Sequence, residues 1–218
     1  MKVAVALPGA HCRWHGEGEP VEIKASKLRG VESYGMICAS SEIGLFDLFP
    51  FTEEATILDL SDFDAPAGTP LADALDLHDI ILEIDNKSMT NRPDLWGHYG
   101  IAREIAALYD LPMNPLPPFD RNVENTAGLT ITVEDSDRCP RMTGTQIEGL
   151  SVKPAPYWMQ NRIWKVGMRP INALVDITNY VMLATGSPSH AYDADNIVDH
   201  IVVRHAKEDE KLMLLNDK

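Results

Sequence analysis

The sequence contains few cysteines and no long apolar run. Cys12, Cys38 and Cys139 are an odd number and form no CxxC pair, which argues against a disulfide framework and against a zinc site. The apolar stretch 3–7 ends at Pro8, too soon for the core of a signal peptide, and no run is long enough to cross a bilayer. We therefore expect reduced thiols, a cytoplasmic location and no membrane partner.

Basic side chains are also scarce. The 19 Lys and Arg residues face 33 Asp and Glu residues, which gives a formal net charge of −14. Residues 1–80 carry 5 basic against 14 acidic side chains, a net charge of −9. Such a surface repels phosphate, so the chain alone should hold RNA weakly, and DNA is not an expected partner. The sequence has neither a phosphate-binding glycine loop nor a cluster of metal ligands, so we assign no metal or cofactor to it.

What the sequence does have is enough apolar material for a folded core. It has 218 residues, 44% of them hydrophobic, with 15 Pro and 14 Gly spread along the chain. This composition argues against a low-complexity tract and against a long coiled coil, and it favours two globular modules. The order of the predicted elements indicates an α+β fold.

Short β-type runs dominate the first third of the chain and predict a small β-barrel over residues 1–79. These runs are 3–7, 21–24, 36–39 and 56–60. Residues 80–118 form the predicted connector. It consists of a strand at 80–85, a helix from Leu95 to Tyr109, and an extended linker whose prolines lack the amide donor that a helix needs.

Residues 119–218 are predicted to be a second, mixed α/β domain. Strands are expected at 129–134 and 142–148, and a hairpin at 201–205 and 212–215. One helix should begin near Pro156 and end at Gly167. A second helix should be capped by Asn172 and end at Gly186. The side chains expected to face the core from this helix are Leu174, Ile177, Val181 and Ala184.

One motif in the first third goes beyond general barrel chemistry. The stretch from Lys27 to Cys38 is similar to the tRNA-binding oligonucleotide-fold family, and the resemblance covers the first module to roughly residue 60. Gly30 and Gly35 have a structural explanation, because they bracket a turn where positive φ costs nothing. The opening strands of such a barrel are missing, so we expect the module to be truncated at its start.

The strand, turn and helix that follow narrow the resemblance. Glu83 to Asp85, Thr90 to Asp94 and Gly100 to Leu108 resemble the corresponding elements of bacterial-type phenylalanyl-tRNA synthetase β subunits. The sequence departs from that pattern by inserting residues 86–89 and by placing Leu95-Trp96-Gly97-His98-Tyr99 after Asp94.

Two arginines of this region allow two interpretations. Arg92 and Arg103 are either contacts to RNA or ties from the turn to Asp94 or Glu104. We favour the ties, because an arginine and a carboxylate form strong charge-assisted hydrogen bonds.

The third region is the most specific. Three blocks, Gly167 to Asn172, Val175 to Met182 and Gly186 to Asp193, together resemble the editing domain of that subunit. The resemblance implies hydrolysis of the ester in tyrosyl-tRNA(Phe), which releases tyrosine and intact tRNA. A second site of this kind is needed because a phenylalanine pocket that tolerates one more hydroxyl rejects tyrosine by only about 1–3 kcal/mol.

The resemblance assigns three side chains to this site. His190 is the catalytic candidate, because an imidazole donates or accepts hydrogen bonds at neutral pH and so can position the ester or a water. Arg169 and Asn179 are the substrate-binding candidates, the first for a phosphate or carbonyl and the second for the amino-acid part. A structural role is the alternative for His190 and, through the helix backbone, for Asn179. Asp176 is assigned to support of the helix start, and the acidic residue that recognises the tyrosine hydroxyl is expected after Lys218.

The parent enzyme that the resemblance implies is a ligase of two α and two β subunits. It charges tRNA(Phe) with phenylalanine in the cytoplasm, using ATP and magnesium at motifs absent from this sequence. The chain alone is therefore expected to be inactive in aminoacylation, and its partners to be tRNA(Phe) and the α subunit. Two alternatives stay open: a non-enzymatic RNA-binding or scaffold module, and an independent hydrolase of mischarged tRNA. The net charge of −9 over residues 1–80 counts against the first, and an end within a predicted hairpin counts against the second.

Overall fold

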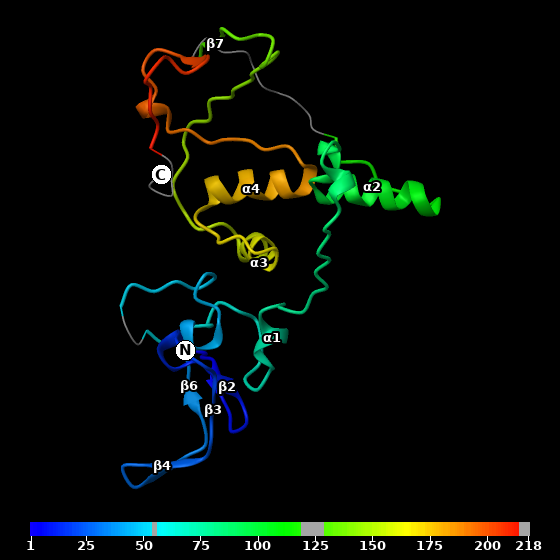
Figure 1. Ribbon diagram of the computed structural model, residues 1–218. Coiled ribbons are helices and arrows are strands. Elements are labelled where there is room, and N and C mark those ends of the chain that lie inside the picture. Colours follow the sequence, from blue (N-terminus) through cyan, green and yellow to red (C-terminus); the bar gives the residue numbers. More distant parts are fainter. Residues whose placement is uncertain (54–55, 119–128, 214–218) are drawn as a thin grey trace. The chain divides into compact units, whose positions relative to one another are not determined.

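The computed structural model describes residues 1–53, 56–118 and 129–213, which contain four α-helices and eight short strands (Figure 1). The chain divides into two compact units, each built from two stretches of sequence. Unit 1 comprises Met1–Leu111 and Val152–Ser189, and unit 2 comprises Pro112–Ser151 and His190–Lys218. The mixture of helices and strand pairs confirms the α+β class. The domains predicted at 1–79, 80–118 and 119–218 stay a prediction.

The strands of unit 1 form three antiparallel pairs. They are β1 (Val5–Ala6) with β6 (Met36–Ile37), β2 (His11–Cys12) with β3 (Val21–Glu22), and β4 (Ser26–Leu28) with β5 (Val31–Ser33). These sheets do not close into a barrel within the described residues, because strands of two or three residues leave too few backbone pairs for closure. The strand predicted at 56–60 is present only as a single bridge between Val3 and Asp59.

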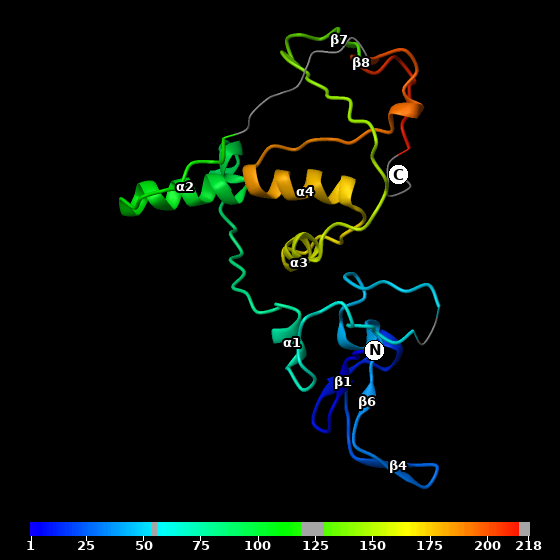
Figure 2. The same ribbon diagram turned by 180° about the vertical axis from the view of Figure 1, so that it is seen from behind.

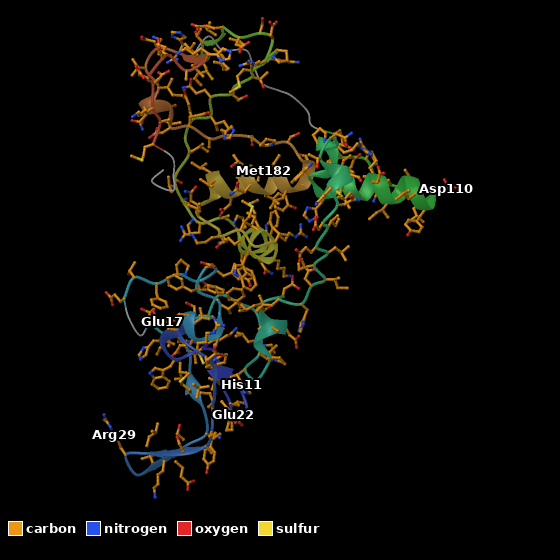
Figure 3. The ribbon with its side chains drawn as sticks, in the orientation of Figure 1. His11, Glu17, Glu22, Arg29, Asp110 and Met182 are labelled. Carbon is orange, nitrogen blue, oxygen red and sulfur yellow. The ribbon has the colours of Figure 1, made fainter. Side chains whose placement is uncertain are left out.

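The β4–β5 hairpin explains both glycines of the tRNA-binding-like motif. Arg29, which Figure 3 shows at the hairpin tip, and Gly30 have φ of 49° and 87°, the pattern of a two-residue type I′ turn. Gly35 is needed for a different reason, because a Cβ there would lie 2.8 Å from the carbonyl oxygen of Ala6 on β1. The predicted positive φ is confirmed for Gly30. The prediction that Gly35 brackets the same turn is wrong, because its φ is not positive and its structural role is the close approach to β1.

A buried apolar cluster stabilises the N-terminal part of unit 1, from Ala4 to Leu75. Its members are Ala4, Ala6, Cys12, Cys38, Leu45, Leu48, Leu58, Leu60 and Leu75. Both cysteines of the cluster are free thiols. Burial raises the pKa of Cys38 to about 11, so this side chain packs as a neutral thiol at physiological pH.

The described residues contain the helices α1 (Leu71–Ala74), α2 (His98–Tyr109), α3 (Tyr157–Lys165) and α4 (Ala173–Thr185). The sequence marks the end of α3 and both ends of α4. Gly167, with φ of 83°, follows α3. Asn172 caps α4 by accepting hydrogen bonds from the N–H groups of Leu174 and Val175, and Gly186, with φ of 76°, ends it. These boundaries confirm the predicted ones.

Two predictions about the connector are wrong. Residues 80–85 form no strand, and the four large apolar side chains there are 50 to 84% exposed. A strand needs a neighbour for its backbone groups, and the described part of the chain provides none. The helix predicted from Leu95 begins only at His98, because Pro93–Leu95 form a separate 3₁₀ turn (η4) and Gly97 is extended.

One face of α3 satisfies the backbone at the end of α1. Tyr157 Oη donates to the Leu75 carbonyl at 2.7 Å, and Asn161 Nδ2 donates to the carbonyl of the following residue at 2.9 Å. Lys165 Nζ lies 3.1 Å from the Asp79 carboxylate. These three side chains are four residues apart, so they project from the same side of the helix. They hold α3 against the residues that follow α1.

Two glycines allow α2 to approach the C-terminal end of α4. A Cβ on Gly97 would lie 2.2 Å from the Gly186 amide nitrogen, so no side chain fits between the two backbones. His98 brings Nδ1 within 2.8 Å of the Leu183 carbonyl, which belongs to the last turn of α4, where helix carbonyls lack an intrahelical donor. The departure from the family pattern at 95–99 thus has a local structural role.

The arginines of the connector form ion pairs. Arg92 donates to both carboxylate oxygens of Asp94, at 3.0 and 2.9 Å, and to Glu104 at 2.9 Å. Arg103 donates to Asp94 at 2.8 Å. The predicted ties are confirmed. The hydrogen bond from Arg92 is the main cause that lowers the pKa of Asp94 to about 2.

The strands of unit 2 form one parallel pair, β7 (Ile131–Val133) with β8 (Ile201–Val203). The predicted hairpin between 201–205 and 212–215 is wrong for the described residues, since β8 pairs with β7 and Leu212 and Met213 form no strand. Residues 214 and 215 lie outside the described residues. The strand predicted at 142–148 is also absent.

An ion pair holds the charged segment that follows β8. Glu210 accepts hydrogen bonds from Arg204 at 2.7 and 2.8 Å and from the Lys207 N–H at 2.7 Å. Arg204 lowers the pKa of Glu210 to about 2. The charged loop therefore folds back onto the end of β8 through an ion pair. No helix in the described ranges combines the length and apolar character needed to cross a membrane.

Asn161→Ala should lower the free energy of unfolding of the chain by about 1 kcal/mol, because the Asp76 carbonyl beyond α1 loses its hydrogen-bond donor. Urea unfolding followed by circular dichroism measures this change. Asn91, an exposed asparagine of the same unit, supplies the control: Asn91→Ala should stay within about 0.5 kcal/mol of the unsubstituted chain. Equal effects of the two substitutions would contradict the role given to the α3 face.

Acid should weaken unit 1 through Asp94. A carboxylate with a depressed pKa stabilises the fold above its unfolded pKa of about 3.9. That contribution is lost as the pH falls toward the folded value of about 2. We expect Asp94→Asn to lower the urea midpoint near neutral pH and to match the unsubstituted chain near pH 2. The exposed Asp62→Asn is the control, and a gap for Asp94→Asn that persists near pH 2 would refute this account.

Candidate functional site

Arg169 lies on the short segment that joins α3 to α4. Gly167 ends the first helix and Asn172 caps the second, so both ends of the segment are fixed by local backbone chemistry. The Arg169 side chain is exposed and makes no hydrogen bond or ion pair with any described residue. Its guanidinium therefore has no competing carboxylate there, in contrast to the paired Arg92 and Arg103.

Asn179 lies in the middle of α4 and is half-buried. Its side-chain amide has no hydrogen-bond partner among the described residues. The structural alternative for this residue required a bond to a nearby backbone group, and the described part of the chain contains no such bond.

His190 is exposed and belongs to unit 2. Its ring centroid lies 6.4 Å from that of Tyr192, with the rings tilted by 52°. Arg169 and Asn179 belong to unit 1. The structure thus brings two of the three candidates into one unit, and the convergence of all three on a common site stays a prediction.

The buried face of α4 differs from the predicted one. Ile177 and Val181, which were expected to face the core, are 46 and 41% exposed. Ala173 and Tyr180 instead pack against a small apolar cluster that includes Met159 of α3. The two helices lie side by side in both views (Figures 1 and 2). The helix is therefore rotated relative to the prediction, and its most buried residue is acidic.

Asp176 is that acidic residue, with 1% of its surface exposed. Its Oδ1 accepts a hydrogen bond from the Ile171 N–H at 2.8 Å, and its Oδ2 is buried without a partner in the described part. The assignment of Asp176 to simple support of the helix start is incomplete, because Asn172 already caps the helix. The sequence signal for a buried acid was a carboxylate between two apolar residues, Val175 and Ile177.

A cation and two aromatic rings join α3 to α4 beside Asn179. Arg162 donates from Nη1 to the Tyr180 hydroxyl at 3.0 Å, and its guanidinium carbon lies 5.4 Å from the centre of the Trp158 ring. The Trp158 and Tyr180 rings meet edge to face at 5.4 Å. These contacts fix the register of the two helices.

Two shallow hollows of about 250 and 180 Å³ lie away from the candidate residues. Residues 25–27 and 32–34 line the first, and residues 40, 49–51 and 56–59 line the second. Among the described residues, no group of three or more His, Cys, Asp or Glu side chains could hold a metal ion.

The comparisons with known proteins show similarity to one domain family and to one kind of enzyme subunit. Residues 138–218 match the B3/4 domain family, and this range contains Arg169, Asn179 and His190. The phenylalanine–tRNA ligase beta subunit of Fusobacterium nucleatum is 37% identical over 217 residues, which is 99% of this chain and 25% of the relative. Those of Solibacter usitatus (40% over 192 residues, 88% and 24%) and Ralstonia nicotianae (41% over 217 residues, 99% and 26%) are similar in the same way.

The resemblance to phenylalanyl-tRNA synthetase β subunits that the motifs predicted is confirmed. The chain spans about a quarter of the length of the curated relatives that it matches.

The two asparagines of α4 should respond differently to alanine. Asn172→Ala removes the cap and should lower the free energy of unfolding by about 1 kcal/mol. Asn179→Ala removes no described hydrogen bond and should change it by less than about 0.5 kcal/mol. Thermal or urea unfolding of the two variants measures the contrast. A loss at Asn179 as large as that at Asn172 would return Asn179 to a structural role.

Proposed function

We propose that this chain is part of a phenylalanine–tRNA ligase beta subunit and contributes to aminoacylation and to the hydrolysis of tyrosine mistakenly esterified to tRNA(Phe). One observation carries the proposal: the B3/4 match at 138–218 contains all three side chains that the motifs assign to the editing site. The similarity to beta subunits over nearly the whole chain supports it.

The reaction is addition of water to the ester carbonyl, followed by release of tyrosine and of the terminal hydroxyl of the tRNA. It needs a positioned water, donors for the ester oxygen and contacts to the nucleotide end. His190 positions the water or the ester through its imidazole. Arg169 holds a phosphate or the carbonyl, which its unpaired and exposed guanidinium suits. Asn179 bridges the amino-acid part.

The rest of the activity belongs to the parent assembly. That assembly joins phenylalanine to tRNA(Phe) in the cytoplasm, with ATP and magnesium bound at an α subunit partner or at parts of the beta subunit that this chain does not cover. The net charge of −14 explains why such a chain depends on its parent for tRNA binding.

A chimera gives a direct test. This chain replaces the matching 217-residue segment of the Ralstonia nicotianae beta subunit, and the chimera is produced with its α subunit. We expect it to hydrolyse tyrosyl-tRNA(Phe) faster than phenylalanyl-tRNA(Phe). His190→Ala should slow tyrosine release by a factor on the order of a hundred or more, while phenylalanine charging continues as the internal control.

The alternatives give different results in the same assay. An RNA-binding or scaffold role predicts that His190→Ala leaves ester loss unchanged while deletion of the segment weakens tRNA binding. An independent hydrolase predicts selective tyrosine release by the purified chain alone. Absence of tyrosine release from a chimera that still charges phenylalanine would refute the editing proposal.

A further inference from the structure

We propose that Asp176 is a positioning residue of the hydrolytic site, and that its buried carboxylate holds the segment carrying Arg169. The inference rests on the proposed function and adds a residue that the sequence motifs left outside the site. It begins from an imbalance: burial of a carboxylate is costly unless hydrogen bonds compensate for the lost water, and only one of the two Asp176 oxygens has a partner in the described part.

The helix start does not account for this carboxylate. Asn172 Oδ1 accepts the N–H groups of Leu174 and Val175, the donors that a cap normally satisfies. Asp176 instead bonds backward, out of the helix, to the N–H of Ile171. Its target is therefore the connecting segment rather than the helix.

That segment is tied on both sides of Arg169. Before it, the Met168 N–H donates to the Ile163 carbonyl at 3.2 Å at the end of α3. After it, Pro170 has no N–H, so the next available donor is Ile171, which Asp176 accepts at 2.8 Å. Arg169 thus lies between two fixed points while its own side chain is exposed. A guanidinium held this way loses less freedom when it binds an anion.

The same residue is placed to affect the second substrate-binding candidate. Asn179 follows Asp176 by three positions, so the two lie on neighbouring positions of one side of α4. A carboxylate at this position links the Arg169 segment to the part of the helix that presents Asn179. This placement accounts for a buried acid in an otherwise apolar stretch of the helix.

The test combines hydrolysis by the chimera with amide exchange. Asp176→Ala should lower kcat/KM for tyrosyl-tRNA(Phe) hydrolysis by a factor on the order of ten to a hundred, mainly through a higher KM. Asp176→Asn keeps the acceptor oxygen and should restore most of the loss. In the Arg169→Ala background, Asp176→Ala should cost little more, because both substitutions remove the same function. Asn161→Ala, which destabilises unit 1 elsewhere, is the control and should leave KM unchanged.

A second readout needs no tRNA. Exchange of the Ile171 amide in the purified chain should be slow, should accelerate in Asp176→Ala, and should stay slow in Asp176→Asn. Additive losses in the double variant, an equal KM increase in Asn161→Ala, or an unprotected Ile171 amide would each overturn the inference. Failure of the unsubstituted chimera to release tyrosine would instead overturn the proposed function, and the positioning role with it, even where Ile171 is protected.

Discussion

The contact between α3 and the end of α1 is the constraint on which unit 1 depends. Residues 152–189 join the first 111 residues in one unit although residues 112–151, which belong to unit 2, separate them in sequence. Hydrophobic burial alone would not fix how α3 lies, because apolar contacts have little directional preference. Hydrogen bonds from Tyr157 and Asn161 to backbone carbonyls are directional, and an unpaired buried carbonyl is costly. They therefore select one placement of α3 relative to the end of α1.

The arginines of unit 1 differ in whether they have partners within the chain. The arginines of the connector are consumed by ion pairs with Asp94 and Glu104. Arg162 is held by Tyr180 and Trp158. Arg169 is exposed and without such a partner in the described part. In a chain with a net charge of −14, an exposed cation without such a partner fits the anion-binding role proposed for Arg169.

The sequence predicted those features that depend on a single residue and its immediate neighbours. Asn172, Gly167 and Gly186 mark helix ends because capping is local chemistry, and Gly30 marks its turn for the same reason. Features that depend on distant partners were missed. Residues 80–85 have strand character but pair with no strand within the described ranges, and β8 pairs with β7 instead of with a hairpin partner among the described residues. The rotation of α4, and hence the burial of Asp176, follows from packing against α3, which periodicity alone did not reveal.

The backbone contact between Gly97 and Gly186 has a consequence for the path of the chain. The end of α4 contacts the Gly97 backbone and the His98 side chain, and His98 lies 85 residues before its partner Leu183 in the sequence. The direction in which Ser187 and Pro188 leave the helix is thus governed by α2, which carries no candidate residue of its own. Substitutions on α2 would therefore alter the course of residues 187–189, with which unit 1 ends.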